Sequence, residues 1–142
     1  LVTLDGSPES REVLPFASAV ASLFGSRLTL LRVIPPHFLL GSTYIPHPTR
    51  EVQGLEAEQG AAREYLDAEA QALRERGLTV EVETVAGAHP VEGILQFVAG
   101  SDVDLVAMAT HGRGGVARLI LGSVADKVIR GGSVPVLLHR AL

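Results

Sequence analysis

Two glycine-bounded segments near the end of the chain have the composition of a phosphate site. Residues 109–112 read Ala-Thr-His-Gly and follow an apolar run, whereas residues 122–126 read Gly-Ser-Val-Ala-Asp and begin a helical pattern. Glycines let backbone N–H groups approach an anion, and a helix N-terminus adds unpaired donors and a positive dipole. We therefore expect a phosphorylated small molecule to bind where a strand passes through this loop into a helix.

Two common phosphate-binding motifs are disfavoured by their context. Residues 112–117 match G-x-G-x-x-A, but the dinucleotide fingerprint follows the first strand of its fold and needs an acidic residue about twenty positions later. A P-loop needs a lysine directly after its glycine, and the single lysine, Lys127, follows Asp126. The loop is therefore a phosphate site of another kind.

Several residues of this region have two interpretations each. Ser123 could only cap the helix, with Asp126 as a loose capping box, or could also hold a terminal phosphate. Arg113 and Arg118 flank the loop and could screen phosphate charge or simply be solvated. The sequence places no serine–carboxylate or histidine cluster around His111, so a hydrogen-bonded structural role is favoured over catalysis.

Alternating strand and helix patterns position these residues. The order predicts a three-layer, doubly wound five-stranded parallel sheet, with strand order 3-2-1-4-5 and helices on both faces. Residues 78–85 alternate apolar and acidic side chains, which is typical of an edge strand. The loop at 35–49 holds four prolines and two histidines, and a loop this long is usually functional or mobile. Strands are expected at 1–4, 27–34, 78–85, 104–109 and 134–139, and helices at 8–24, 50–76, 90–98 and 123–130. Ser7 is expected to cap the first helix and Gly25 to end it.

The predicted strand order gives Asp5 a possible role. Asp5 follows the first strand, and the 109–123 loop follows the fourth, so the two face each other across the crevice where the strand order reverses. Asp5 could accept hydrogen bonds from a ribose or an adenine there. Its alternative role is that of an N-terminal helix cap.

Composition limits the class of protein. The 142 residues suit one domain, 1–142, and a net charge of −4 gives no footprint for nonspecific nucleic-acid binding. There is no cysteine, and no run approaches the roughly 18 apolar residues of a membrane helix. The chain opens inside a strand pattern without Met or a signal-peptide pattern, so we expect residues to precede Leu1. A cytoplasmic protein without nucleic-acid or membrane partners is the expectation.

These motifs together resemble the universal stress protein family over essentially the whole chain. The family signature is Gly-x-x-Gly, nine residues and Gly-[Ser/Thr] after the fourth strand, with Asp-Gly-Ser ending the first. The matching segments are 4–7, 30–33, 85–87 with Pro90, 110–112, 122–123 and 134–138. One position departs from the signature, because its first glycine is Ala109 here.

The resemblance implies an ATP-binding homodimer. Asp5 and the Val33 backbone would hold adenine and ribose, and the 109–124 region would hold the triphosphate, with Mg²⁺ bridging its oxygens. Family members usually dimerise through the last strand, here Val134–Leu138, whose apolar edge would otherwise be exposed. The candidate binding residues are Leu4, Asp5, Val33, Met108, Ala109, His111, Gly112, Arg113, Gly122, Ser123 and Val124.

Two functional hypotheses follow from the resemblance. The first is an ATP-binding stress-response protein that acts as a binding and signalling module, not as an enzyme, with at most slow hydrolysis. The second is a nucleotide-free dimeric interaction protein of the same fold, for which Ala109 is the only support. An enzyme of the related adenine-nucleotide folds is disfavoured, because their His-x-x-His and Ser-Gly-Gly-x-x-Ser motifs are missing from the sequence.

Overall fold

Five parallel strands form the centre of the computed structural model, which describes residues 1–36, 48–110 and 122–140. Their order across the sheet is β3-β2-β1-β4-β5, so the predicted topology is confirmed. The strands are β1 (Val2–Thr3), β2 (Leu28–Ile34), β3 (Val80–Ala86), β4 (Val106–Ala109) and β5 (Val136–His139).

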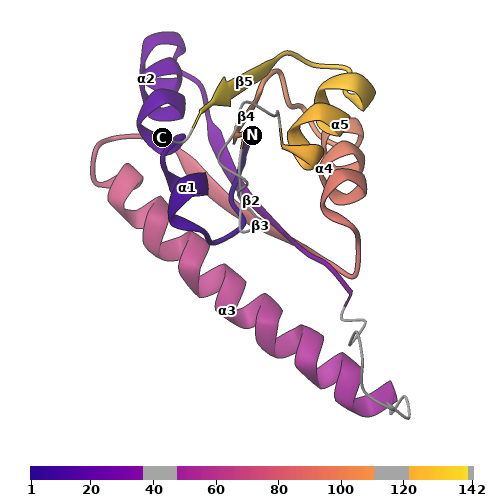
Figure 1. Cartoon of the computed structure of the whole chain (residues 1–142). Coiled ribbons are helices and arrows are strands. Elements are labelled where there is room, and N and C mark those ends of the chain that lie inside the picture. Colours follow the sequence, from indigo (N-terminus) through magenta and orange to yellow (C-terminus); the bar gives the residue numbers. More distant parts are fainter. Residues whose placement is uncertain (37–47, 111–121, 141–142) are drawn as a thin grey trace.

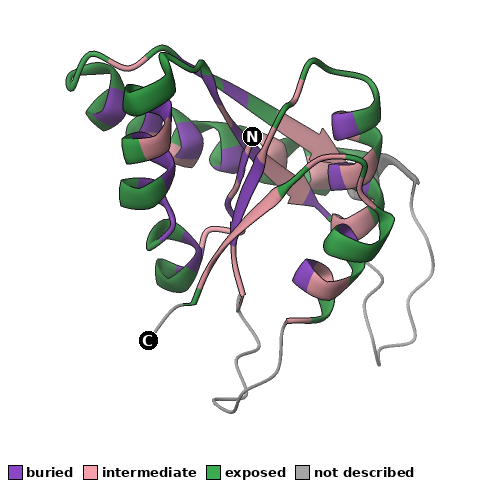
Figure 2. Ribbon diagram, turned by 90° about the horizontal axis from the view of Figure 1, so that it is seen from above, coloured by how far each residue is buried: buried purple, intermediate pink, exposed green. Residues whose placement is uncertain are grey.

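Helices cover both faces of this sheet, as the sequence predicted (Figure 1). On one face, α2 and α3 pack against a buried apolar cluster, and on the other α4 and α5 enclose a second one. Figure 2 shows the same layers from above, with the buried residues of the helices turned toward the sheet. The helices are α1 (Pro8–Arg11), α2 (Leu14–Phe24), α3 (Pro48–Arg74), α4 (Pro90–Ala99) and α5 (Ser123–Gly131).

Strand β2 shows why its sequence is almost continuously apolar. Successive side chains of a strand point to opposite faces. Leu28 and Leu30 accordingly join the cluster under α2 and α3, whereas Leu31 and Val33 join the cluster under α4 and α5. At the edge of the sheet β3 instead alternates buried valines with exposed glutamates, which confirms the predicted edge strand.

The helix predicted at 8–24 is divided in two, which corrects the sequence-based assignment. Ser7 caps α1 as expected, but α1 ends at Arg11 and α2 begins at Leu14. Pro15 explains the break, because proline has no N–H and its ring clashes with the carbonyl four residues earlier in a continuous helix. Gly25 ends α2 in the left-handed conformation at φ 63°, as its position predicted.

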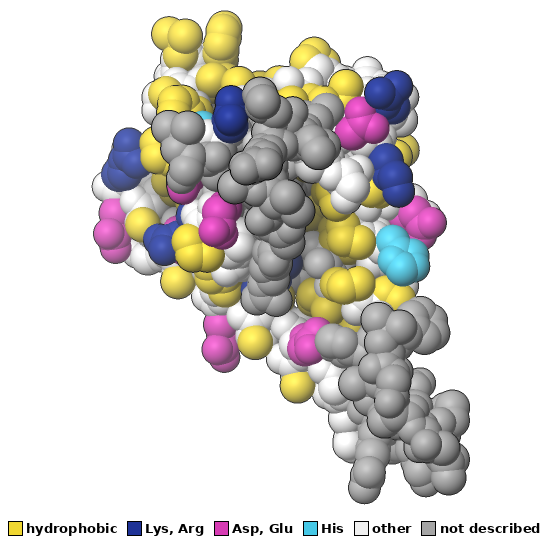
Figure 3. Space-filling model, viewed as in Figure 1, with side chains coloured by type: hydrophobic (Ala, Val, Ile, Leu, Met, Phe, Trp, Pro, Cys, Tyr) yellow, Lys and Arg dark blue, Asp and Glu magenta, His cyan; other side chains and the backbone are white. Residues whose placement is uncertain are grey.

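Helix α2 also presents an apolar outer surface. Five large apolar side chains are exposed in the described part of the chain, and three of them, Phe16, Leu23 and Phe24, belong to α2. Leu23 and Phe24 lie at the end of the helix and are 78% and 74% exposed; apolar side chains also gather over this end of the molecule in Figure 3. Residues 13–24 therefore carry more apolar side chains than the core of the described residues buries.

Helix α3 is the longest element, with 27 residues, and its first turns extend beyond the sheet (Figure 1). Its exposed surface is charged, and it packs on β2 and β3 through Ala62, Leu66, Ala70 and Leu73. Within 1–36, 48–110 and 122–140, none of the helices combines the length and the apolar character needed to cross a membrane.

Two glycines with equally open surroundings provide a test of the backbone assignments. A Cβ added at Gly60, inside α3, or at Gly25 would meet no atom within 4 Å, but only Gly25 has a positive φ. We expect Gly60→Ala to raise the free energy of unfolding by about 0.5–1 kcal/mol through helix propensity. Gly25→Ala should lower it, because alanine strains the left-handed conformation. Urea unfolding of both variants measures the two changes, and equal signs would contradict the assignments.

Candidate functional site

Strand β1 brings the predicted site segments together at the carboxyl ends of the strands. It pairs with β2 on one side and with β4 on the other, and Val2 lies opposite Ala107. Continuing this parallel register by two residues places Leu4 opposite Ala109, the last residue of β4. Asp5 and the start of the 110–122 connection therefore leave the sheet side by side. The strand order reverses between β1 and β4, and the crevice beyond the carboxyl ends of two such strands is the usual ligand position in sheets of this kind.

The turn after β1 is organised by the Asp5 carboxylate. Its Oδ1 accepts hydrogen bonds from the Ser7 backbone N–H, at 2.9 Å, and from the Ser7 hydroxyl. The Ser7 hydroxyl in turn accepts from the N–H of Ser10, at 3.1 Å, and so caps α1. The alternative role of Asp5 as the helix cap is therefore wrong, because Asp5 orients the serine that caps the helix.

The start of α5 also differs from the capping interpretation. Gly122 occupies the N-cap position, and Ser123 is the first helical residue, with an exposed side chain. With Gly122 as the N-cap, Asp126 is the fourth helical residue and not at the capping-box position, and its carboxylate binds the Arg130 guanidinium at 2.9 and 3.0 Å. Ser123 as a helix cap is thus wrong.

Some of the candidate binding residues have buried side chains, so only their backbone groups can contact a ligand. Leu4 is 2% and Met108 is 4% exposed, and each belongs to one of the two apolar clusters. Val124 is half-buried against the cluster under α4 and α5. Any contact that Leu4 or Met108 makes with a ligand must therefore come from the main chain.

Ala109, the departure from the signature, lies in regular strand geometry. It pairs with His139 in the β4–β5 ladder, and the next residue, Thr110, donates its N–H to the His139 carbonyl at 2.9 Å. Extended backbone is available to any residue, so this position does not require glycine for conformational reasons.

Val33 is held by a close approach of α4. A Cβ added at Gly93 would lie 2.7 Å from Cγ1 and 2.9 Å from Cγ2 of Val33. Because only glycine permits this spacing, α4 packs directly on the end of β2 and holds Val33 beside the crevice. Gly93 was not among the residues predicted from the sequence, although a glycine in the middle of a helical pattern is a signal of close packing.

Two further residues beside the crevice were missed, Arg32 and Tyr65. The Arg32 guanidinium carbon lies 5.6 Å from the centre of the Tyr65 ring. The Tyr65 hydroxyl is buried. Burial raises the pKa of Tyr65, and the Glu69 carboxylate raises it further, so the phenol is neutral at physiological pH. The available signal was Arg32 itself, a charged residue inside a mostly apolar strand.

The remaining candidates, His111, Gly112 and Arg113, lie outside the described residues, as do Arg118 and most of the proline-containing loop.

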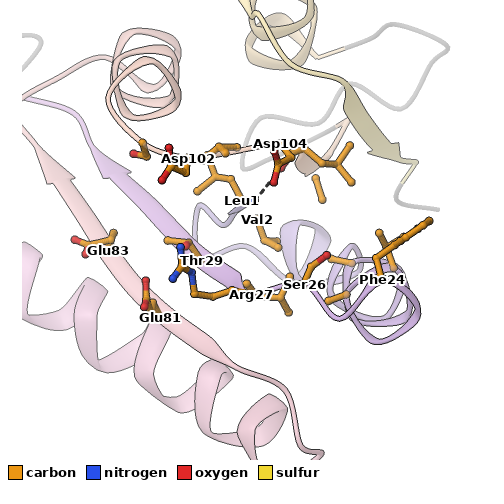
Figure 4. A pocket seen from close by; sticks show the side chains of 18 of the residues that line it. Leu1, Val2, Phe24, Ser26, Arg27, Thr29, Glu81, Glu83, Asp102 and Asp104 are labelled. Atoms are coloured by element: carbon orange, nitrogen blue, oxygen red, sulfur yellow. Dashed lines mark hydrogen bonds between the residues drawn. The ribbon is translucent and has the colours of Figure 1, made fainter.

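A hollow of about 480 Å³ lies at the other side of the sheet, near the amino-terminal ends of the strands (Figure 4). Acidic side chains of β3 and of the segment before β4 surround it, together with Arg27, Phe24 and Leu1. The Leu1 amino group donates to the Leu105 carbonyl at 2.8 Å there. Because these residues precede or begin the strands, the hollow is separate from the crevice at the strand ends.

Comparison with known proteins identifies the family. The model of the universal stress protein family matches residues 1–140. A universal stress protein of Thermus aquaticus is 34% identical over 140 residues, which cover 99% of this chain and 96% of the relative. The chain therefore belongs to the universal stress protein family.

Solved structures show the same fold. A universal stress protein from Lactobacillus plantarum superposes with a TM-score of 0.81 at 19% identity, covering 98% of this chain and 94% of the other. The Archaeoglobus fulgidus universal stress protein in complex with dAMP gives a TM-score of 0.64 at 22% identity, covering 96% and 92%.

Gly93→Ala tests the packing of α4 on Val33. We expect the added methyl to overlap the Val33 side chain and to lower the free energy of unfolding by about 1–3 kcal/mol, more than helix propensity returns. Gly60→Ala makes the same change at an open helical position and should stabilise. Urea unfolding measures both, and a stabilised Gly93→Ala variant would show that α4 is not in close contact with β2.

Proposed function

We propose that this protein binds ATP in the crevice between the ends of β1 and β4 and acts as a nucleotide-dependent binding module in a stress response. One observation carries the proposal. The Asp5 turn after β1 and the residues that follow β4 begin next to each other, at the carboxyl ends of the two strands. Family membership supports the stress-response role. A relative of the same fold was solved with dAMP, which supports an adenine nucleotide as the ligand class.

The start of α5 is suited to a phosphate group. The first N–H groups of a helix have no partner within the helix, and its dipole favours an anion at this end. We propose that the Gly122, Ser123 and Val124 N–H groups and the Ser123 hydroxyl hold the terminal phosphates. Gly112 and Arg113 are proposed to complete the phosphate contacts, with His111 beside them and Mg²⁺ between phosphate oxygens.

The nucleoside is proposed to lie nearer to β1 and β2. A carboxylate can accept hydrogen bonds from several donors, so Asp5 can serve a ribose or adenine while it holds Ser7. The backbones of Leu4, Val33, Met108 and Ala109 would form the adjoining wall, consistent with the buried side chains of Leu4 and Met108.

We propose binding and signalling, with hydrolysis at most slow, as the activity. Membership of the universal stress protein family supports a binding role over that of a classical enzyme. A nucleotide-free interaction protein of the same fold is the second candidate, supported only by Ala109.

Calorimetric titration with ATP and Mg²⁺ tests the ligand. We expect Ser123→Ala to weaken ATP about tenfold or more, because a hydrogen bond to a charged group contributes roughly 1.5–3 kcal/mol. Gly122→Val should weaken it as well. Ser133→Ala, also an exposed serine but placed before β5, is the matched control and should bind like the wild type.

The outcomes separate the two candidates. Unchanged affinity in both site variants would refute the phosphate assignment. No binding by the wild type at millimolar ATP would refute ATP binding and favour the nucleotide-free protein, whereas AMP binding as tight as ATP would show that the terminal phosphates make no contact.

We also propose a homodimer formed through the last strand. Val134–Leu138 ends the sheet at β5, and the apolar side chains of β5 are only half-buried. An edge strand exposes a row of N–H and C=O groups, which a second copy can satisfy by antiparallel pairing around a two-fold axis. Phe16 stacks on His139 beside this edge, at 4.6 Å between ring centroids, and is half exposed.

Val136→Asp should convert this dimer into monomers, because pairing would bring two buried carboxylates together. Val85→Asp is the matched control: Val85 is a half-buried valine on β3, the other edge strand, and packs against the same cluster. Light scattering with chromatography measures the mass, and thermal melting shows that both variants fold. A folded Val136→Asp variant that remains dimeric would place the interface elsewhere.

A further inference from the structure

The turn that carries Asp5 rests on the guanidinium of Arg32. Gly6 follows Asp5 with φ 84°, and a Cβ added there would lie 2.9 Å from Nη1, 3.0 Å from Cζ and 3.1 Å from Nη2 of Arg32. If this Cβ approached the guanidinium in its plane, from the side of the two terminal nitrogens, its distance to Cζ would be clearly longer than its distances to Nη1 and Nη2. The three nearly equal distances therefore show that the flat face of the guanidinium covers Gly6.

Arg32 is also supported by α3. Its guanidinium carbon lies 5.6 Å from the Tyr65 ring centre, within the range of cation–π attraction. Glu69, one turn after Tyr65, binds Arg11 of α1 at 2.7 Å between Oε1 and Nε. Helix α3 thus contacts α1 through this ion pair and supports Arg32 through the Tyr65 ring.

These contacts connect Arg32 to the orientation of the Asp5 carboxylate. Gly6 lies between Asp5 and Ser7, the residue whose N–H and hydroxyl bind Asp5 Oδ1. A shift of Gly6 changes the distance between these two partners. The planar face of arginine suits this contact with a bare Cα, whereas the ammonium of lysine is a compact point charge without such a face.

We propose that Arg32 is a positioning residue that holds the Asp5 turn in the geometry required for the nucleoside. This inference rests on the proposed function, since it assigns to Arg32 a part in the same site. Arg32 acts through Gly6 and the Asp5–Ser7 hydrogen bonds.

Arg32→Met and Arg32→Lys test the proposal with two readouts. Methionine keeps the length of the side chain without charge or planar face, and lysine keeps the charge alone. Hydrogen exchange of the Ser7 amide, measured by NMR without nucleotide, should become about tenfold faster in Arg32→Met. Calorimetry should show ATP binding weakened about tenfold, and Arg32→Lys should not restore either value.

Arg74→Met is the matched control. Arg74 is an exposed arginine that also makes polar contacts across elements: it donates two hydrogen bonds to the Val80 carbonyl, at 3.0 and 2.7 Å, and so joins the end of α3 to the start of β3. Its loss should lower the melting temperature while Ser7 exchange and ATP affinity stay at wild-type values.

The outcomes distinguish this inference from the proposed function. If the wild type binds ATP and Arg32→Met leaves both Ser7 exchange and affinity unchanged, the positioning role is refuted and ATP binding stands. If the wild type fails to bind ATP while Arg32→Met accelerates Ser7 exchange, the ligand is wrong and the support of the Asp5 turn by Arg32 is upheld. If Arg74→Met changes Ser7 exchange as Arg32→Met does, the effect is general loss of stability and the inference is overturned.

Discussion

Strand β1 lies between β2 and β4, and its two parallel ladders determine where every segment of the proposed site leaves the sheet. The Leu4 N–H donates to the Leu31 carbonyl, and the Ala107 N–H donates to the Leu1 carbonyl. Val2 between them is fully buried. Because the carboxyl ends of parallel strands lie on the same side of the sheet, the chain leaves β1 and β4 from neighbouring positions, where ligands of such sheets usually bind.

Two glycines convert this topology into a defined geometry. Gly93 lets α4 approach Val33 on one face of the sheet, and Gly6 lets the Arg32 guanidinium cover the β1–α1 turn on the other. The reasons differ, because Gly6 needs both a positive φ and the absence of a Cβ, whereas Gly93 needs only the latter. Packing against the sheet is therefore directly connected to the position of the candidate binding groups.

Membership of a family and the chemistry of one site are separate conclusions here. The family follows from similarity over nearly the whole chain and from the fold. The choice between an ATP-binding and a nucleotide-free protein depends instead on a few positions. The structure bears on one of these positions, Ala109. Ala109 lies in an extended ladder, so the backbone there does not need glycine, and only crowding of the ribose or α-phosphate by its methyl group still favours a nucleotide-free protein.

The sequence by itself determined the alternating strands and helices and the main helix ends, because apolar periodicity, Ser7 and Gly25 act on their near neighbours in the chain. The strand order followed from the doubly wound sheet that this alternation predicts. Pro15 was equally local and was overlooked. Only the tertiary structure decided that Asp5 orients Ser7, that Gly122 caps α5, and that Arg32 covers Gly6. These contacts depend on turn geometry and on the distance between packed layers, which periodicity along the chain does not encode.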